Sequence, residues 1–166
     1  ICEILNPLNC DTAVVTVPVH SASIDAVNDA GTSVNGYTGG TAFTNVLIND
    51  TLNGVAVIPS EVTTTFVSST NAGITLSGTN VIVAPGTPAG NYTLTYQICE
   101  ILNPLNCDTA VVTIPVSATA IDAVNDPGNN VLTGLGGQSY PNVLINDTLN
   151  GNQATLSNVI LTQVST

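Results

Sequence analysis

The feature that most constrains this chain is an internal repeat with a period of 97 residues. The first 16 residues, ICEILNPLNCDTAVVT, recur letter for letter at 98–113. Of the 69 positions related by this offset, 43 carry the same residue, and the offset holds to the end of the chain without a gap. Such self-similarity is typical of a structural unit that occurs in tandem.

Two short stretches of small residues, HSAS at 20–23 and SATA at 117–120, mark the boundaries between units. They divide the chain into the C-terminal hairpin of a preceding repeat (1–20), one complete repeat (21–117) and the N-terminal half of the following repeat (118–166). A half unit and a hairpin of this size bury too little surface to be stable alone. We therefore expect a continuous tandem array; subunits completed by strands of their neighbours are the alternative.

The hydrophobic pattern within the complete unit predicts β-strands throughout. Apolar residues alternate with polar ones in two long runs, placing Tyr92, Leu94, Tyr96 and Ile98 on one face of the first, and Ala110, Val112, Ile114 and Val116 on one face of the second. Shorter strands are expected at 24–28, 44–48, 55–58, 61–68, 74–77 and 80–84. Because proline lacks an N–H group, Pro115 indicates an edge or a bulge.

Strands of this number and spacing predict an all-β fold. About seven strands in 97 residues are typical of an immunoglobulin-like β-sandwich with Greek-key connections. The chain is thus expected to consist of tandem sandwiches of this kind.

Composition excludes several partners. The chain has no Lys or Arg and 11 Asp and Glu residues, which gives a net charge of −11. Without basic side chains it cannot neutralise phosphates, so neither nucleic acid nor an anionic membrane surface is expected as a partner. No apolar run approaches the roughly 18 residues of a membrane span, so membrane insertion is not expected.

The four cysteines form two local pairs. Cys2 with Cys10, and Cys99 with Cys107, flank two copies of the loop EILNPLN, in which an Asn-Pro step favours a turn. Strands that enter and leave such a loop lie side by side, which brings the two sulfur atoms within bonding range. We predict hairpin disulfides and hence an oxidising, extracellular setting, with buried free thiols as the alternative. The spacing is not that of a zinc site.

Acidic and amide side chains recur as strictly as the cysteines. Since no basic residue can balance them, a calcium ion bound by oxygen ligands beside the linker is one interpretation. The alternative is that these Asx residues cap turns, and no cofactor is then needed. The candidate ligands are Asp25, Asp29, Asn49, Asp50, Asp122, Asp126, Asn146 and Asp147.

Catalysis is not expected. The only histidine, His20, has a serine as its repeat counterpart, so no site built on it could recur in each unit. The chain also lacks the Gly-x-Ser-x-Gly elbow of a serine hydrolase.

The segment 84–116, APGTPAGNYTLTYQICEILNPLNCDTAVVTIPV, followed by IDAVND and NVLINDTLNG, resembles the tandem repeats of very large surface proteins of gliding Bacteroidota. These proteins are similar to the gliding-motility adhesin and its relatives, which are exported by the type IX system. IDAVND and VLINDT also resemble the opening of bacterial cadherin-like repeats. The resemblance covers essentially the whole chain and implies long extracellular filaments of immunoglobulin-like domains.

The resemblance also implies covalent glycans. Bacteria of this group attach O-glycans at Asp-Thr followed by a small or aliphatic residue, and four sites fit: Thr12, Thr51, Thr109 and Thr148. The alternative is that Asp-Thr only begins a turn or a strand. Three matches to the N-linked acceptor pattern, at Asn49, Asn91 and Asn146, carry little weight in a bacterial chain.

These features predict a structural repeat of an extracellular filament, stalk or fibrous adhesin, whose partners are neighbouring repeats or identical subunits. A module that binds ligands or glycans, and a spacer attached to a secreted enzyme, are the alternatives.

Overall fold

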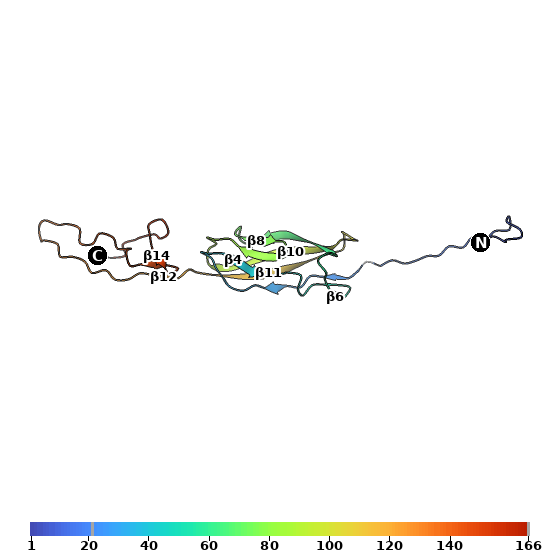
Figure 1. Ribbon diagram of the computed structural model, residues 1–166, viewed down its shortest axis with the longest axis horizontal. Helices are drawn as coiled ribbons and strands as arrows, with labels where there is room; N and C mark the ends of the chain where they lie inside the picture. Colours follow the sequence, from blue (N-terminus) through green and yellow to red (C-terminus); the bar gives the residue numbers. More distant parts are fainter. Residues whose placement is uncertain (21, 166) are drawn as a thin grey trace.

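The computed structural model describes residues 1–20 and 22–165, and within them every regular element is a β-strand. One folded body lies in the middle of an elongated molecule (Figure 1). The chain enters this body at one end and leaves it at the other.

The larger sheet of the body has five strands. Two of them, the long strands β10 (Gly90–Glu100) and β11 (Cys107–Ser117), pair antiparallel over ten residues and form its centre. β7 (Val62–Ser69) flanks β10 on one side. Two short strands, β2 (Asp29–Ala30) and β3 (Val34–Asn35), run parallel to β11 on the other side.

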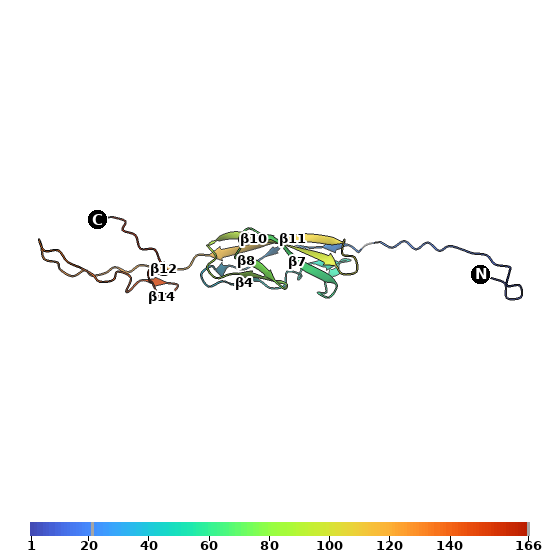
Figure 2. The ribbon, with the colours of Figure 1, turned by 90° about the horizontal axis from the view of Figure 1, so that it is seen from above.

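A second sheet faces the first. It has three antiparallel strands in the order β4 (Gly40–Phe43), β9 (Asn80–Val83) and β8 (Ile74–Ser77). Figure 2 shows the two sheets as layers of one body. Apolar side chains from both sheets form a single buried cluster, as in a β-sandwich.

The alternation predicted for the two long strands is confirmed. Leu94, Tyr96 and Ile98 of β10 are fully buried and Tyr92 packs partly buried against the core. On β11 the inward residues are likewise buried, and they are Ala110, Val112, Ile114 and Val116. Residues on these faces alternate with more exposed neighbours because successive side chains of a strand point to opposite sides.

Pro115 does not lie on an edge strand, because β11 has neighbours on both sides. It pairs with Asn91 of β10, and on its other side the parallel partner is interrupted between β2 and β3. In that interruption the amide of Gly31 donates to Thr113 O and the amide of Thr32 turns away to Ala42 O. The proline thus occupies a position at which no partner strand needs its missing N–H group.

The prediction of a strand at 44–48 is wrong. These residues form a turn in which Asn45 has a φ of 60°, and Val46 and Leu47 are buried without belonging to a strand. An apolar run can fill a core from a turn as well as from a strand, and periodicity does not separate the two.

A third, small sheet lies at the end of the body where the chain enters. It consists of β1 (Ile24–Asp25), β5 (Thr51–Leu52) and β6 (Val55–Ala56). The same arrangement recurs 97 residues later as β12 (Ile121–Asp122), β13 (Thr148–Leu149) and β14 (Asn152–Gln153). The register recurs as well, because Ile24 pairs with Leu52 and Ile121 pairs with Leu149.

Residues 1–20 make no sheet with the body. Their one bridge joins Cys2 and Cys10, and every side chain among them is exposed. All members of the core cluster, by contrast, lie between Ile24 and Val116. This extent agrees with a complete unit at 21–117, whose boundaries remain a prediction.

Candidate functional site

The hydroxyl of Tyr96, at the middle of β10, is a polar group buried in the body. It lies 2.9 Å from Val46 O, 3.1 Å from each carboxylate oxygen of Asp50 and 3.5 Å from Asp29 Oδ2. Tyr96 and Asp50 have no exposed surface, and Asp29 is 7% exposed. We call Tyr96, Asp29 and Asp50 the buried polar centre; it joins β10, β2 and the turn that precedes β5.

The proton count of this centre is unusual. Tyr96 has one hydroxyl proton, whereas carboxylate and carbonyl oxygens surround it, and these are acceptors only. The amide of Val27 supplies a further donor, at 2.8 Å from Asp50 Oδ1. A proton retained on one carboxyl group would supply another donor where two negative charges otherwise lie close together.

The pKa values agree with that count. Burial, together with the nearby charge of Asp50, raises the pKa of Asp29 from its ordinary value of 3.8 to about 6, although hydrogen bonds from Asn49 and Tyr96 act in the opposite direction. Burial also raises the pKa of Asp50, although its bonds from Val27 and Tyr96 act in the opposite direction. Burial and the two carboxylates raise the pKa of Tyr96, so its hydroxyl stays protonated.

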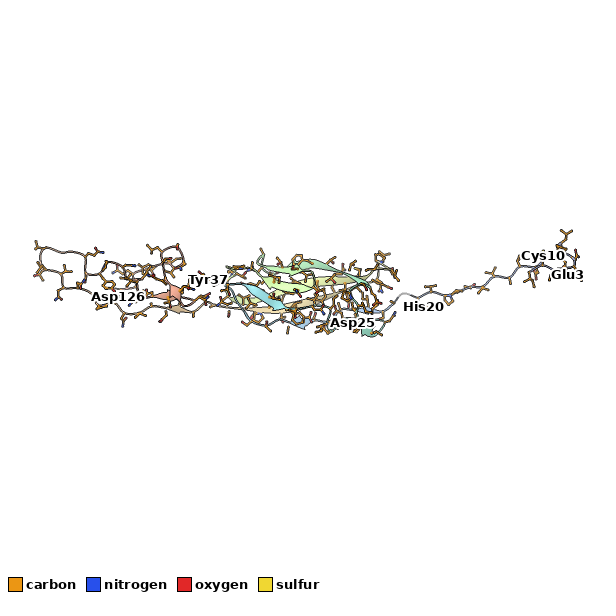
Figure 3. The ribbon with its side chains drawn as sticks, viewed as in Figure 1. Glu3, Cys10, His20, Asp25, Tyr37 and Asp126 are labelled. Atoms are coloured by element: carbon orange, nitrogen blue, oxygen red, sulfur yellow. A yellow bond between two sulfur atoms is a disulfide. The ribbon has the colours of Figure 1, made fainter. Side chains whose placement is uncertain are left out.

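Among the residues predicted to bind calcium, the structure brings Asp29 and Asp50 together but not Asp25. Asp25 lies exposed on β1 and pairs with Thr51 (Figure 3). The side-chain nitrogen of Asn49 donates to Val27 O and Asn28 O at 3.4 Å, an interaction that fixes the loop. Within residues 1–20 and 22–165 no three Asp, Glu, His or Cys side chains form a group able to hold a metal ion.

The half unit repeats part of this centre. Asp147 Oδ1 accepts from the amide of Val124 at 2.8 Å, as Asp50 does from Val27. Asn146 donates to Asn125 O, and Asp122 pairs with Thr148 on the small sheet. Asp126 Oδ1 is buried and has no hydrogen-bond partner in the described chain.

Both hairpin disulfides are present, between Cys2 and Cys10 and between Cys99 and Cys107, with Cα atoms 4.0 and 4.1 Å apart. The described chain has no free cysteine. A disulfide is stable in an oxidising environment, which these two indicate for this protein.

The aspartates of the four Asp-Thr motifs all bind backbone amides. Asp11 and Asp108 each accept from the amide of the following threonine at 2.8 Å. Asp108 also accepts from the amide of Ala26 at 2.8 Å, which ties β11 to the start of the unit. These contacts are made by the aspartates, and they agree with the alternative that Asp-Thr begins a turn or a strand; glycosylation stays a prediction.

The four threonines differ in exposure. Thr12 and Thr109 are exposed, whereas Thr51 and Thr148 are half-buried in the small sheets. Asp50, which precedes Thr51, is fully buried. In the folded unit, the motif at 108–109 is therefore more accessible than the motif at 50–51.

Sequence patterns did not reveal three contributions to these sites. The hydroxyl of Tyr96 binds Asp50, 46 positions away, and Asp108 accepts from the amide of Ala26, 82 positions away. The side chain of Asn106 donates to Ala22 O, 84 positions away. Alternation placed Tyr96 in the core correctly, and a tyrosine there signals a buried hydroxyl that needs a partner. No pattern in the residues around Tyr96 indicates that Asp50 is the partner of its hydroxyl.

No family model matches this chain, and no curated protein matches it. Across the described residues, no helix is long and apolar enough to span a membrane.

Proposed function

We propose that the chain is part of a tandem array of immunoglobulin-like domains in an extracellular filament or stalk, where each repeat adds length. One observation carries this proposal: the polypeptide enters the sandwich at one end and leaves at the opposite end (Figure 1). Because the sequence repeats every 97 residues, this path places successive units in a line.

The strand order supports the immunoglobulin-like assignment. The chain passes from β2 and β3 of the first sheet to β4 of the second, back to β7, across again to β8 and β9, and returns to β10 and β11. This alternation produces two sheets from non-consecutive strands, as Greek-key sandwiches do. β2 and β3, which lie end to end as the two parts of one interrupted strand, both run parallel to β11, the last strand of the sandwich.

The dimensions of one repeat follow from its longest strand. β11 has 11 residues, which at about 3.3 Å per residue span about 36 Å. Three residues at 118–120 separate β11 from β12 and add at most about 10 Å. Each repeat then lengthens the array by about 45 Å.

Composition suits such an array to an exposed position. The absence of Lys and Arg leaves proteases of trypsin specificity no cleavage site. The uniform negative charge opposes lateral association of filaments, most strongly at low salt. The two disulfides fit an extracellular location, and O-glycans at Thr109 and Thr12 would add to the protection.

The test is the growth of size with repeat number. Proteins with one, two and four copies of the 97-residue unit should show maximum dimensions in X-ray scattering that rise linearly, by about 45 Å per copy. Growth of less than half that increment would contradict a linear array. A glycan-array screen on the same proteins addresses the competing role, because specific micromolar binding would identify a ligand-binding adhesin module instead.

A further inference from the structure

We propose that the disulfide-closed loop at 99–107 is a docking surface for the linker that enters the same repeat, and that it thereby restrains the joint between consecutive repeats. The occupant is the linker from the preceding repeat, represented by Val19, His20, Ala22 and Ser23. The inference rests on the proposed tandem array and concerns its joints.

The central contact is made by Asn106, the residue before Cys107. Its side-chain nitrogen donates to Ala22 O at 2.8 Å and to Glu100 Oε2 at 2.9 Å. The two donor hydrogens of one amide group thus hold the linker on one side and the opposite arm of the loop on the other. A groove beside this contact is lined by Val19, His20, Ala22, Glu100, Leu102 and Asn103.

A second element holds the linker one residue further on. The amide of Asn53 donates to Ser23 O at 2.7 Å, and the amide of Ser23 donates to Asn53 Oδ1 at 3.2 Å. Asn53 and Gly54 form the tight turn between β5 and β6, with φ values of 56° and 72° that favour this residue pair. In the half unit, Asn150 makes the same backbone bond to Ala120 O at 2.7 Å.

The loop keeps its internal bonds whether or not a linker lies against it. In the copy at 2–10, where every residue is exposed, Asn9 donates to Glu3 Oε2 at 2.9 Å, as Asn106 does to Glu100. The amide of Glu3 donates to Asn9 O at 2.9 Å, and that of Glu100 donates to Asn106 O at 3.0 Å. Figure 3 shows Glu3 and Cys10 together at the far end of the molecule, away from the folded body.

This comparison separates two roles of the disulfide. Since the loop forms the same network away from a sandwich, the disulfide and the loop's own hydrogen bonds are sufficient to preorganise the asparagine. A preorganised donor loses little conformational entropy when it binds the linker. The disulfide therefore acts on the joint through Asn106, in addition to any stabilisation of the domain.

The two copies of the loop supply matched variants for a test on the whole chain. Asn106→Ala removes the donor to Ala22, whereas Asn9→Ala removes the same side chain from a loop that holds no linker in this structure. Cys99→Ser with Cys107→Ser, and Cys2→Ser with Cys10→Ser, form the second matched pair. The measurement is the ¹⁵N-{¹H} NOE of the Ala22 and Ser23 amides, with Thr113 of β11 as the internal reference.

In the parent protein, Ala22 and Ser23 should give NOE values close to that of Thr113. Asn106→Ala and the 99/107 double variant should lower the Ala22 value by at least half, whereas Ser23 keeps its two bonds to Asn53 and serves as a local reference. The variants at 9 and 2/10 should leave both values unchanged. An Ala22 NOE that stays unchanged in Asn106→Ala, or that falls equally in Asn9→Ala, would overturn the proposal. Should the double variant not fold, Asn106→Ala alone decides. If the NMR result overturns this proposal, X-ray scattering can still show that the array grows linearly with repeat number. The two experiments therefore distinguish a failure of this proposal from a failure of the proposed function.

Discussion

The hydroxyl oxygen of Tyr96 lies 3.1 Å from both carboxylate oxygens of Asp50, and neither residue has any surface exposed to solvent. A buried carboxylate usually has a basic partner, and this chain has no Lys or Arg to offer. Instead, the Tyr96 hydroxyl and the backbone amide of Val27 donate hydrogen bonds to the Asp50 carboxylate, where a basic side chain would usually bind. The same centre ties together segments that are far apart in the sequence.

Removal of the Tyr96 hydroxyl should destabilise the domain. In Tyr96→Phe the carbonyl of Val46 and the Asp50 carboxylate lose their shared donor within the core, which should lower the free energy of unfolding by about 1–3 kcal/mol. Chemical denaturation followed by circular dichroism measures this change. Tyr92→Phe is the control, because the Tyr92 hydroxyl bonds Pro88 O near the surface. Equal losses in both variants would contradict a special role for Tyr96.

Stability should depend on pH through Asp29. Its pKa is about 6 in the folded state and 3.8 ordinarily, so the folded state binds the proton more tightly. The resulting stabilisation is complete below about pH 4 and is lost as the pH rises through 6, by at most about 3 kcal/mol. The melting temperature of the parent protein should accordingly fall between pH 4 and pH 7.

Asp29→Asn should flatten this pH dependence, because the amide supplies a donor at every pH. Glu61→Gln, which removes an exposed carboxylate from the same unit, controls for the general effect of net charge. If the two variants retain equal slopes of melting temperature against pH, the assignment to Asp29 is wrong.

Chelation tests the calcium hypothesis. Asp50 is engaged by Tyr96 and Val27, and Asn49 directs its amide nitrogen to Val27 O and Asn28 O. Because protein donors occupy these oxygens, we expect the melting temperature to be the same in excess EDTA and in millimolar CaCl₂. A rise of several degrees with calcium that Asp29→Asn abolishes would instead establish a cation site.

Glycosylation is tested by the intact mass of native protein. Thr109 is exposed on β11, so we expect an added glycan there that Thr109→Ala removes. Thr113→Ala is the matched control, since Thr113 is exposed on the same strand but follows Val112 and not an aspartate. A native mass equal to that of the bare polypeptide would exclude glycans at all four motifs.

Local patterns predicted the long strands well. The buried faces of β10 and β11 and the pairing of the cysteines depend on side-chain alternation and on short loops, and both are visible in a few consecutive residues. The apolar run at 44–48 predicted a strand but forms a turn. Val46 and Leu47 are apolar because they are buried in the core of the body, not because they alternate along a strand. Pro115 predicted an edge or a bulge, and the sequence could not choose between them because the interruption between β2 and β3 lies more than 80 residues away.

The amino-acid sequence is enough to predict the 97-residue period, the all-β character, the two disulfide pairs and the lack of Lys or Arg partners for the acids. Each of these follows from residue identity or from spacing along the chain. The folded structure was needed to show which acids are buried together, that Tyr96 binds them, and that Asn106 reaches the linker at Ala22. These contacts join residues 46 and 84 positions apart, and their geometry depends on how the two sheets pack.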